Sequence, residues 1–153
     1  MKIVFVKNKQ EIATVHRLFR EYENFLDVDL CFQQFEKELA SLPGKYALPD
    51  GALFLAMDQD TAAGCVGLRK TDTGICEMKR LFVKPGYRGK GVGRMLAEKS
   101  IHEAKKLGYK KMRLDTMDWL KKAVRLYESL GFQQIPPYYH NPISGAAFWE
   151  LNL

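Results

Sequence analysis

"VKPGYRGKGVGRMLAEKSI", residues 83–101, joins an apolar segment to a stretch with helical spacing. Its first twelve positions hold four glycines and four basic residues. A helix N-terminus leaves backbone N–H groups unpaired and carries the positive end of the helix dipole. Because glycines let a ligand approach the backbone closely, the segment predicts an anion-binding turn suited to phosphate groups.

Three known phosphate-binding patterns can be compared with this turn. The P-loop requires a lysine followed by serine or threonine, which the turn lacks, and this disfavours a nucleotide kinase. The dinucleotide pattern GxGxxG, started at Gly89, meets Arg94 at its sixth position and also fails. The third pattern, R/Q-x-x-G-x-G/A, matches at Arg88, Gly91 and Gly93.

The residues on either side of the turn predict a regular order of strands and helices. Apolar residues recur at helical spacing in 9–26, 31–42, 92–107 and 119–130. Strands are expected at 2–6, 51–58, 61–71, 74–83, 109–116, 132–135 and 145–153. Three consecutive strands imply antiparallel hairpins, and a strand, helix and strand across the glycine turn imply a right-handed parallel crossover. We therefore expect an α/β, or mixed α+β, fold.

Length and composition limit the class of protein. The 153 residues fit a single domain, 1–153, and 46% apolar with 27% charged residues is typical of a soluble globular protein. The N-terminal residues reach charged positions too soon for a signal peptide or a membrane span, so we expect a cytoplasmic protein. Three cysteines without a CxxC pair argue against a disulfide framework.

The charge of the chain favours acidic partners. The formal net charge is +6, and fifteen of the 24 lysines and arginines lie between residues 79 and 125. Phosphates, nucleic acid and an anionic surface are all candidates. The basic segment offers neither interleaved aromatic residues nor a clear recognition helix, so we expect neither a nucleic-acid nor a membrane partner. The three histidines, His16, His102 and His140, have no ligand spacing, and no metal site is predicted.

Two motifs together resemble the GNAT superfamily of acetyl-CoA dependent N-acetyltransferases. They are "EMKRLFVKPGYRGKGVGRML", residues 77–96, and "AVRLYESLGF", residues 123–132, in the order that the family shows. The likeness covers roughly residues 51–135. Within the family, the chain resembles small single-domain bacterial members. It implies a GNAT fold, in which one mixed, mostly antiparallel twisted sheet of about seven strands carries about four helices on both faces.

The resemblance also implies the co-substrate and the reaction. Acetyl-CoA would donate its acetyl group to a primary amine of a small molecule, an amino acid or a peptide, by direct transfer in a ternary complex. The amides of the turn would hold the pyrophosphate, and strand residues would lie along the pantetheine arm, with the Leu81 N–H at the thioester carbonyl. The coenzyme-binding residues would be Leu81, Phe82, Val83, Arg88, Gly89, Lys90, Gly91, Val92, Gly93 and Arg94.

Two residues are candidates for proton transfer. Glu77 lies four residues before Leu81, and period-two alternation places both side chains on the same side of the strand. It matches the position where several family members carry a glutamate base. An ordered water as the base, and a glutamate paired only with Lys79 or Arg80, both stay open. Tyr127 matches the general acid of the family, with a core tyrosine as the alternative.

The acceptor side lies outside the motifs. Arg80 could bind a carboxylate of an amino-acid substrate, and Tyr138, Tyr139 and Asn141 combine aromatic area with hydrogen-bonding groups in a loop. An aromatic-rich hairpin is the alternative interpretation of that loop. Acidic residues elsewhere favour a cationic amine instead, namely Asp27, Asp29 and Glu36. These indications oppose one another, and the sequence does not identify the acceptor.

One position departs from the family pattern. Many members carry an asparagine seven residues before the tyrosine, where this chain has Leu120, so coenzyme binding must rely more on the phosphate turn. A non-catalytic module that senses acyl-CoA through the same fold remains an alternative function. The oligomeric state stays open between a monomer and a homodimer paired through the last strands.

Overall fold

The computed structural model describes residues 1–153 with the exception of Phe32. The strands are β1 (Lys2–Phe5), β2 (Ala52–Asp58), β3 (Thr61–Asp72), β4 (Ile75–Val83), β5 (Lys111–Met117), β6 (Gln133–Ile135) and β7 (Ala146–Asn152). The helices are α1 (Lys9–Leu26), α2 (Phe35–Ala40), α3 (Val92–Lys106) and α4 (Lys121–Ser129). Short 3-10 turns complete the chain at η1 (Cys31–Gln33), η2 (Gly44–Tyr46) and η3 (Pro85–Tyr87).

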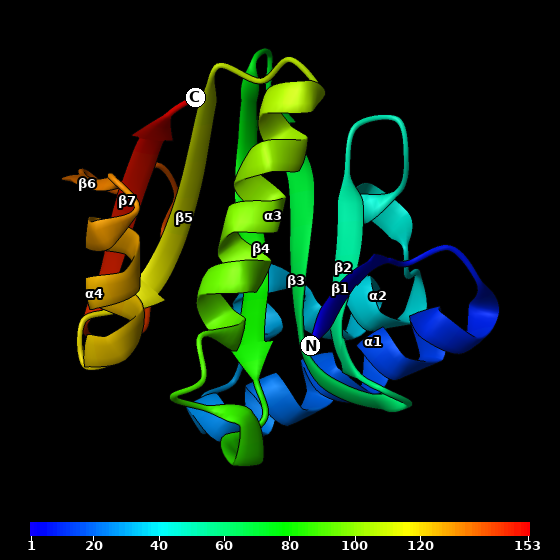
Figure 1. Ribbon diagram of the computed structural model, residues 1–153. Coiled ribbons are helices and arrows are strands. Elements are labelled where there is room, and N and C mark those ends of the chain that lie inside the picture. The colour runs from blue at the N-terminus through cyan, green and yellow to red at the C-terminus, as the bar shows by residue number, and fades with distance from the viewer.

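The described strands form one seven-stranded sheet with the order β1-β2-β3-β4-β5-β7-β6. β4 and β5 pair in parallel, while the other neighbours pair antiparallel. The parallel pair is joined through α3, which needs the length of a crossover connection. This arrangement confirms the expected mixed, mostly antiparallel sheet (Figure 1).

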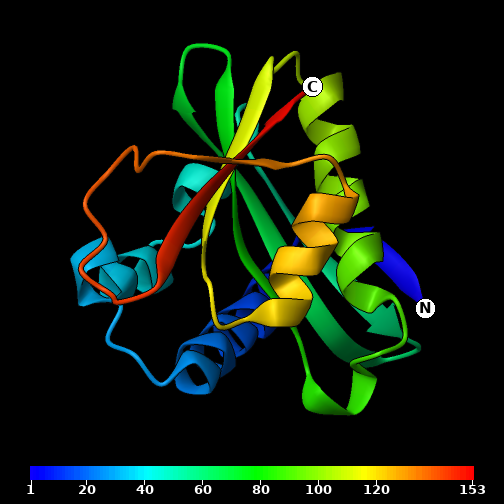
Figure 2. The same cartoon turned by 90° about the vertical axis from the view of Figure 1, so that its left-hand side faces the viewer.

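The helices cover both faces of the sheet. α3 and α4 lie on one face, and α1 and α2 lie on the other (Figures 1 and 2). α1 starts at a capping box formed by Asn8 and Glu11, which satisfies two otherwise unpaired backbone donors. Its buried stripe includes Val15, Leu18 and Phe19, and faces the sheet as the helical period requires. The local sequence therefore fixes both the start and the buried side of this helix.

Each face of the sheet has its own hydrophobic core. The core under α3 and α4 includes Leu96, Ala97 and Leu114, and the core under α1 and α2 includes Phe19 and Phe35. A fully buried side chain of this size contributes about 1.5–3 kcal/mol. Both cores pack against β4, in the middle of the sheet. A gap can therefore open between β4 and a neighbouring strand while β4 keeps its packing on both faces.

The second helix expected at 31–42 is shorter than predicted. The segment forms η1, and then α2 from Phe35 to Ala40, because Gln34 between them adopts a left-handed conformation with φ of 56°. A left-handed residue cannot continue a right-handed helix. No helix among the described residues has both the length and the apolar character needed to cross a membrane.

β4 contains a bulge that changes which side chains share a face. The register with β3 shifts between Cys65 and Gly67, and Arg80 opposite this point has φ of 60°. Met78 belongs to the core under α3, whereas Phe82, four residues later, belongs to the core under α1. A regular strand would place these two side chains on one face. One extra residue at the bulge reverses the alternation.

The bulge makes one expectation from the sequence wrong. Glu77 and Leu81 do not share a face, because the extra residue lies between them. Leu81 packs against the core under α3, and Glu77 points to the side of the sheet that carries α1 and α2. Period-two counting fails here because the sequence of β4 carries no glycine or proline to mark the irregularity.

Gly64 is predicted to be essential for the close approach of β3 to the bulge. It pairs with Val83, and an added Cβ would lie 2.5 Å from the Phe82 carbonyl oxygen, which is backbone and cannot rotate away. We expect Gly64→Ala to lower the free energy of unfolding by about 1–3 kcal/mol in urea titrations. Gly86→Ala is the control, because nothing lies within 4 Å of its added Cβ. Equal stability of the two variants would contradict the prediction.

Candidate active site

A cavity of about 560 Å³ opens where β4 and β5 separate. The two strands pair only from Ile75 to Glu77 against Lys111 to Arg113, and they diverge below that point in Figure 1. The cavity is lined by the ends of both strands, the C-terminal half of α1, η1, and the first turns of α3 and α4. Since these helices lie on opposite faces, the cavity is lined by residues from both faces of the sheet.

The glycine turn forms one end of this cavity. Gly91 is the N-cap residue of α3 with φ of 80°, and Gly89 has φ of 77°, so both occupy the left-handed region that favours glycine. No side chain caps the helix, and the first amides of α3 stay without a side-chain partner. Uncapped amides at the positive end of a helix suit an anion, and the binding of an anion at this turn stays a prediction.

The basic side chains of the turn are held by the protein. The Arg88 Nε donates to the Val83 carbonyl oxygen at 2.9 Å, and its guanidinium lies 4.3 Å from the centroid of the Phe25 ring. Arg94 donates to Ser129 Oγ. The Val83 carbonyl, which the resemblance assigns to the pantetheine arm, is therefore hydrogen-bonded to Arg88 in this structure.

Tyr127 lies in the wall of the cavity on the α4 side. Its ring packs edge-on against Phe132, with centroids 5.7 Å apart, and it belongs to the buried core under α3 and α4. Burial raises the pKa of Tyr127 well above its ordinary value, so the hydroxyl keeps its proton at neutral pH. Tyr127 therefore packs in the core and lines the cavity at once, and its role as a general acid stays a prediction.

The departure at Leu120 has a structural consequence. Leu120 is the N-cap residue of α4, and its apolar side chain makes no cap hydrogen bond. The first amides of α4 therefore lack a side-chain partner beside the cavity. Lys121 and Lys122, which follow Leu120, also line the cavity and add positive charge at this end.

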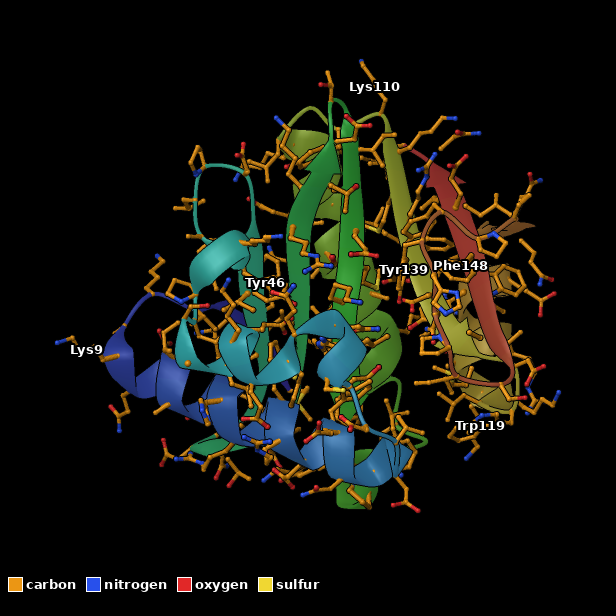
Figure 3. All side chains as sticks on the ribbon, turned by 180° about the vertical axis from the view of Figure 1, so that it is seen from behind. Lys9, Tyr46, Lys110, Trp119, Tyr139 and Phe148 are labelled. Atoms are coloured by element: carbon orange, nitrogen blue, oxygen red, sulfur yellow. The ribbon has the colours of Figure 1, made fainter. Side chains whose placement is uncertain are left out.

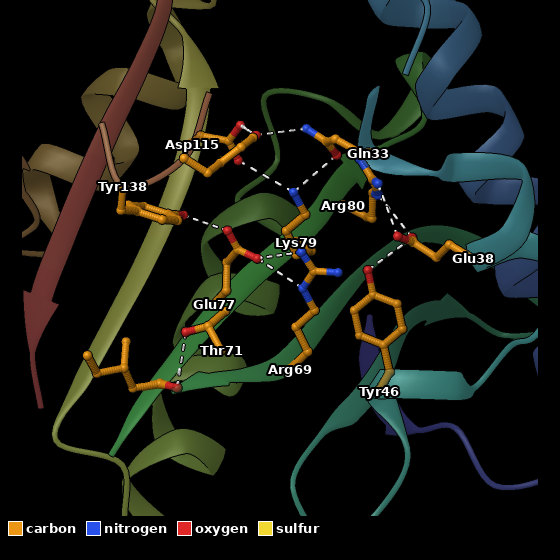
Figure 4. A network of polar contacts seen from close by, with 12 residues as sticks. Gln33, Glu38, Tyr46, Arg69, Thr71, Glu77, Lys79, Arg80, Asp115 and Tyr138 are labelled. Atoms are coloured by element: carbon orange, nitrogen blue, oxygen red, sulfur yellow. Dashed lines mark hydrogen bonds and ion pairs between the residues drawn. The ribbon is translucent and has the colours of Figure 1, made fainter. Parts of the chain in front are cut away.

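Glu77 takes part in a buried polar network on the opposite face (Figure 4). Its carboxylate, 2% exposed, accepts hydrogen bonds from Arg69 Nε at 2.9 Å and from the Tyr138 hydroxyl. Glu77 is not among the described residues that line the cavity. It is therefore neither the exposed strand glutamate of the alternative interpretation nor a group in direct contact with the cavity.

Asp115, at the end of β5, is the carboxylate that lines the cavity. It accepts hydrogen bonds from the Tyr139 hydroxyl, from Asn141 Nδ2 at 3.0 Å, and from Lys79 Nζ at 3.5 Å. Burial alone would raise the pKa of Asp115, but the charge of Lys79 and the two neutral donors outweigh it. The pKa of Asp115 therefore lies below its ordinary value, and the group is ionised at neutral pH.

Tyr138, Tyr139 and Asn141 lie in the loop between β6 and β7, which reaches across to η1 (Figures 2 and 3). Gln33 Nε2 donates to the Tyr139 hydroxyl at 3.0 Å. The three side chains hold the carboxylates of Glu77 and Asp115, and they are not among the described residues that line the cavity. A direct contact of theirs with an acceptor stays a prediction.

Lys79 and Arg80 both face α1 and α2 and both line the cavity. Arg80 binds Glu38 through two N–H groups at 3.1 Å and lies 5.0 Å from the Phe35 ring centroid. Lys79 Nζ lies 3.2 Å from Gln33 Oε1. Burial lowers the pKa of Lys79 below its ordinary value, because it outweighs the attraction of nearby Glu77 and Asp115.

The sequence motifs do not indicate Lys79, Asp115 or Gln33 as site residues. Regular alternation would put Lys79 and Arg80 on opposite faces, and only the bulge brings them together. Asp115 comes at the end of the strand that follows the crossover, a position where ligand-binding residues of α/β sheets are common. The position of Asp115 at the end of this strand is the feature from which it could be predicted. Gln33 lies in η1, far from either motif in the sequence.

Comparisons with known proteins agree with this geometry. The model of the acetyltransferase (GNAT) family matches residues 12–132. An uncharacterized N-acetyltransferase of Schizosaccharomyces pombe is 42% identical over 100% of this chain and 95% of its own length. An acetyltransferase from Streptococcus agalactiae has a TM-score of 0.82 at 24% identity, covering 99% of this chain and 98% of that one. PaiA N-acetyltransferase from Thermoplasma acidophilum, solved with coenzyme A, has a TM-score of 0.74 at 19% identity, with full coverage of both chains.

The uncapped glycine turn at the start of α3 lies at one end of the cavity between β4 and β5. The chain belongs to the GNAT acetyltransferase family. It is therefore an N-acetyltransferase of the class that uses acetyl-CoA as the acetyl donor, as the resemblance in its two motifs implies.

Proposed function

We propose that this protein transfers the acetyl group of acetyl-CoA directly to a primary amine that is bound at the same time. The observation that carries the proposal is the cavity between β4 and β5, which has the uncapped α3 N-terminus at one end and the buried polar network at the other. Because the cavity is lined by residues from both faces of the sheet, donor and acceptor would reach the reacting atoms from opposite sides. Direct transfer then needs no covalent enzyme intermediate.

The residues present suit acetyl-CoA. The amides from Arg88 to Arg94 would bind its phosphates, and Leu81, Phe82 and Val83 would lie along its pantetheine arm. Leu81 lies beyond the last pair between β4 and β5, and we propose that its N–H donates to the thioester carbonyl oxygen. The Thermoplasma acidophilum enzyme has a related fold and was solved with coenzyme A, which supports this assignment.

Acetyl-CoA, when bound, supplies the acetyl group as a thioester. A carbon–nitrogen bond forms to the neutral acceptor amine while the carbon–sulfur bond breaks. The amine proton passes to a carboxylate directly or through water, and the Tyr127 hydroxyl gives its proton to the departing sulfur and later regains one from solvent. The high pKa of Tyr127 keeps that proton in place until the thiolate develops.

We assign the proton acceptor to Asp115 rather than to Glu77. Asp115 is ionised and lines the cavity, whereas the Glu77 carboxylate lies behind it and accepts hydrogen bonds from Arg69 and Tyr138. A general base must come within hydrogen-bond reach of the proton, directly or through one water. Asp115 lines the cavity in which the acceptor would bind, whereas Glu77 holds Arg69 and the Tyr138 loop.

Acetyl-CoA should raise the melting temperature of the protein, and Gly91→Ala should reduce this effect. A Cβ at Gly91 would project into open space at the phosphate-binding turn. Loss of a hydrogen bond to a charged group weakens binding by roughly tenfold or more. A titration of the thermal shift with acetyl-CoA measures the change in dissociation constant.

Gly108→Ala is the matched control for this experiment. Gly108 lies at the C-terminal end of α3 with φ of 90°, and nothing lies within 4 Å of its added Cβ. Both variants acquire the same left-handed backbone strain of about 1–2 kcal/mol. Acetyl-CoA affinity should fall in Gly91→Ala alone. No shift with acetyl-CoA in the wild type would refute the proposed function.

Tyr127→Phe tests the general acid. Phenylalanine keeps the packing against Phe132 and removes only the hydroxyl. We expect kcat to fall about a hundredfold, because a positioned proton donor contributes about that much. The acetyl-CoA dissociation constant should stay close to that of the wild type. Release of free thiol in the presence of an amine is the assay, and a wild type that binds acetyl-CoA but releases none with any amine would favour the sensor alternative.

Asp115→Asn and Glu77→Gln separate the two candidate bases. We expect Asp115→Asn to lower kcat by about a hundredfold at neutral pH. Part of the rate should return as the pH rises, because more of the acceptor amine is then neutral without a base. Glu77→Gln should lower stability but keep kcat near that of the wild type. The opposite pattern of rates would return the role to Glu77.

A further inference from the structure

The charged residues that line the cavity are mostly basic. Among the described lining residues, six are basic and one, Asp115, is acidic. Four of the basic residues lie at the end formed by the turn before α3 and by α4, where the phosphates would bind: Arg88, Lys121, Lys122 and Arg125. Lys79 and Arg80 remain at the other end, on the face covered by α1 and α2. These two cations contact η1 and α2, and they are not part of the phosphate-binding turn.

The bulge places these two cations side by side. Consecutive strand residues normally point to opposite faces, yet Lys79 contacts Gln33 of η1 and Arg80 contacts Glu38 of α2. Arg80 adopts φ of 60°, which costs a residue with a Cβ about 1–2 kcal/mol. Strained backbone of this kind is concentrated at functional sites. Here the strained backbone at Arg80 places two positive side chains next to each other at the acceptor end of the cavity.

Lys79 has hydrogen-bonding capacity that its neighbours do not fill. Its side chain is only 4% exposed, and its ammonium lies 3.2 Å from Gln33 Oε1 and 3.5 Å from Asp115 Oδ1. Charge-assisted bonds are normally about 2.7–2.9 Å long. An ammonium carries three donors, and a guanidinium carries five, of which the two bonds to Glu38 use two. A carboxylate in the cavity would give Lys79 a short charged partner.

The acidic residues that would favour a cationic amine lie outside the cavity. Asp27, Asp29 and Glu36 are not among the described residues that line the cavity. The Asp29 carboxylate accepts from the Cys31 backbone N–H at 2.8 Å, and Glu36 forms a bidentate pair with Arg20. This leaves Asp115 as the single lining carboxylate that could face an amine.

We propose that Lys79 and Arg80 bind a carboxylate of the acceptor, so that the acceptor is a small amino acid or a similar amino-carboxylate. The site then matches both charges of such a molecule, with the cations at its carboxylate and Asp115 at its amine. This inference rests on the proposed function, because it names the substrate class of the same site. Lys79 is assigned as a specificity-determining residue.

The test compares each protein amino acid with its carboxamide as acceptor, by free-thiol release with saturating acetyl-CoA. A nearby carboxylate raises the pKa of an amine, so the amide is the more easily deprotonated nucleophile. A preference for the acid therefore reports recognition of the carboxylate. We expect kcat/KM for the preferred amino acid to exceed that for its amide by about ten- to a hundredfold.

Three variants connect the preference to Lys79. Lys79→Met should abolish the preference by raising KM for the acid, whereas Lys79→Arg, which keeps the charge, should retain part of it. Lys70→Met is the control, because Lys70 is an exposed lysine of β3 that is not among the described lining residues. A thermal shift with acetyl-CoA checks that each variant is folded and binds the donor.

The outcomes distinguish the two levels of the proposal. If the wild type shows no shift with acetyl-CoA, the proposed function and this inference both fail. If it binds acetyl-CoA but acetylates amides or diamines as well as amino acids, the inference alone is wrong. If the wild type prefers the acid and Lys79→Met keeps that preference, the assignment to Lys79 is wrong. Loss of the preference in Lys79→Met alone supports the inference.

Discussion

β4 and β5 are parallel neighbours, yet their pairing ends at Glu77 and Arg113. Beyond this point the two strands diverge, and a cavity of about 560 Å³ lies between them. Backbone N–H and C=O groups in a buried region need hydrogen-bonding partners. A ligand with amide groups, inserted between the strands, can supply them. The broken pairing thus provides space and hydrogen-bonding capacity at the same place. The core under α3 and α4 packs against both strands, and Phe82 of β4 also packs in the core under α1 and α2.

The bulge at Arg80 is the second element of this arrangement. Without it, alternation along β4 would direct Lys79 and Arg80 to opposite faces, and one of them would point into the apolar core under α3. With it, Leu81 and Val83 face that core and both cations face α1 and α2. The paired hydrogen bonds between Arg80 and Glu38 offset the backbone strain that the left-handed residue carries.

The polar network beneath the cavity balances its charges. It contains three carboxylates and three basic groups, namely Glu38, Glu77, Asp115, Arg69, Lys79 and Arg80. Buried charges are tolerated when they are paired and hydrogen-bonded. Tyr138 and Tyr139, from the loop after β6, donate to two of these carboxylates and tie that loop to the sheet. These hydrogen bonds fix the shape of this end of the cavity in the protein alone.

Local patterns were sufficient for the order of strands and helices, for the parallel crossover, and for the glycine turn at the start of α3, because each follows from residues close together in the chain. Gly89 and Gly91 occupy left-handed backbone, and α3 begins at the expected point. The faces of β4 and the neighbours of Asp115 were not accessible in this way, because a bulge of ordinary residues leaves no mark in the sequence. The contacts of Lys79 join η1, β4 and β5, segments 36 to 46 residues apart, and only packing of the whole sheet brings them together.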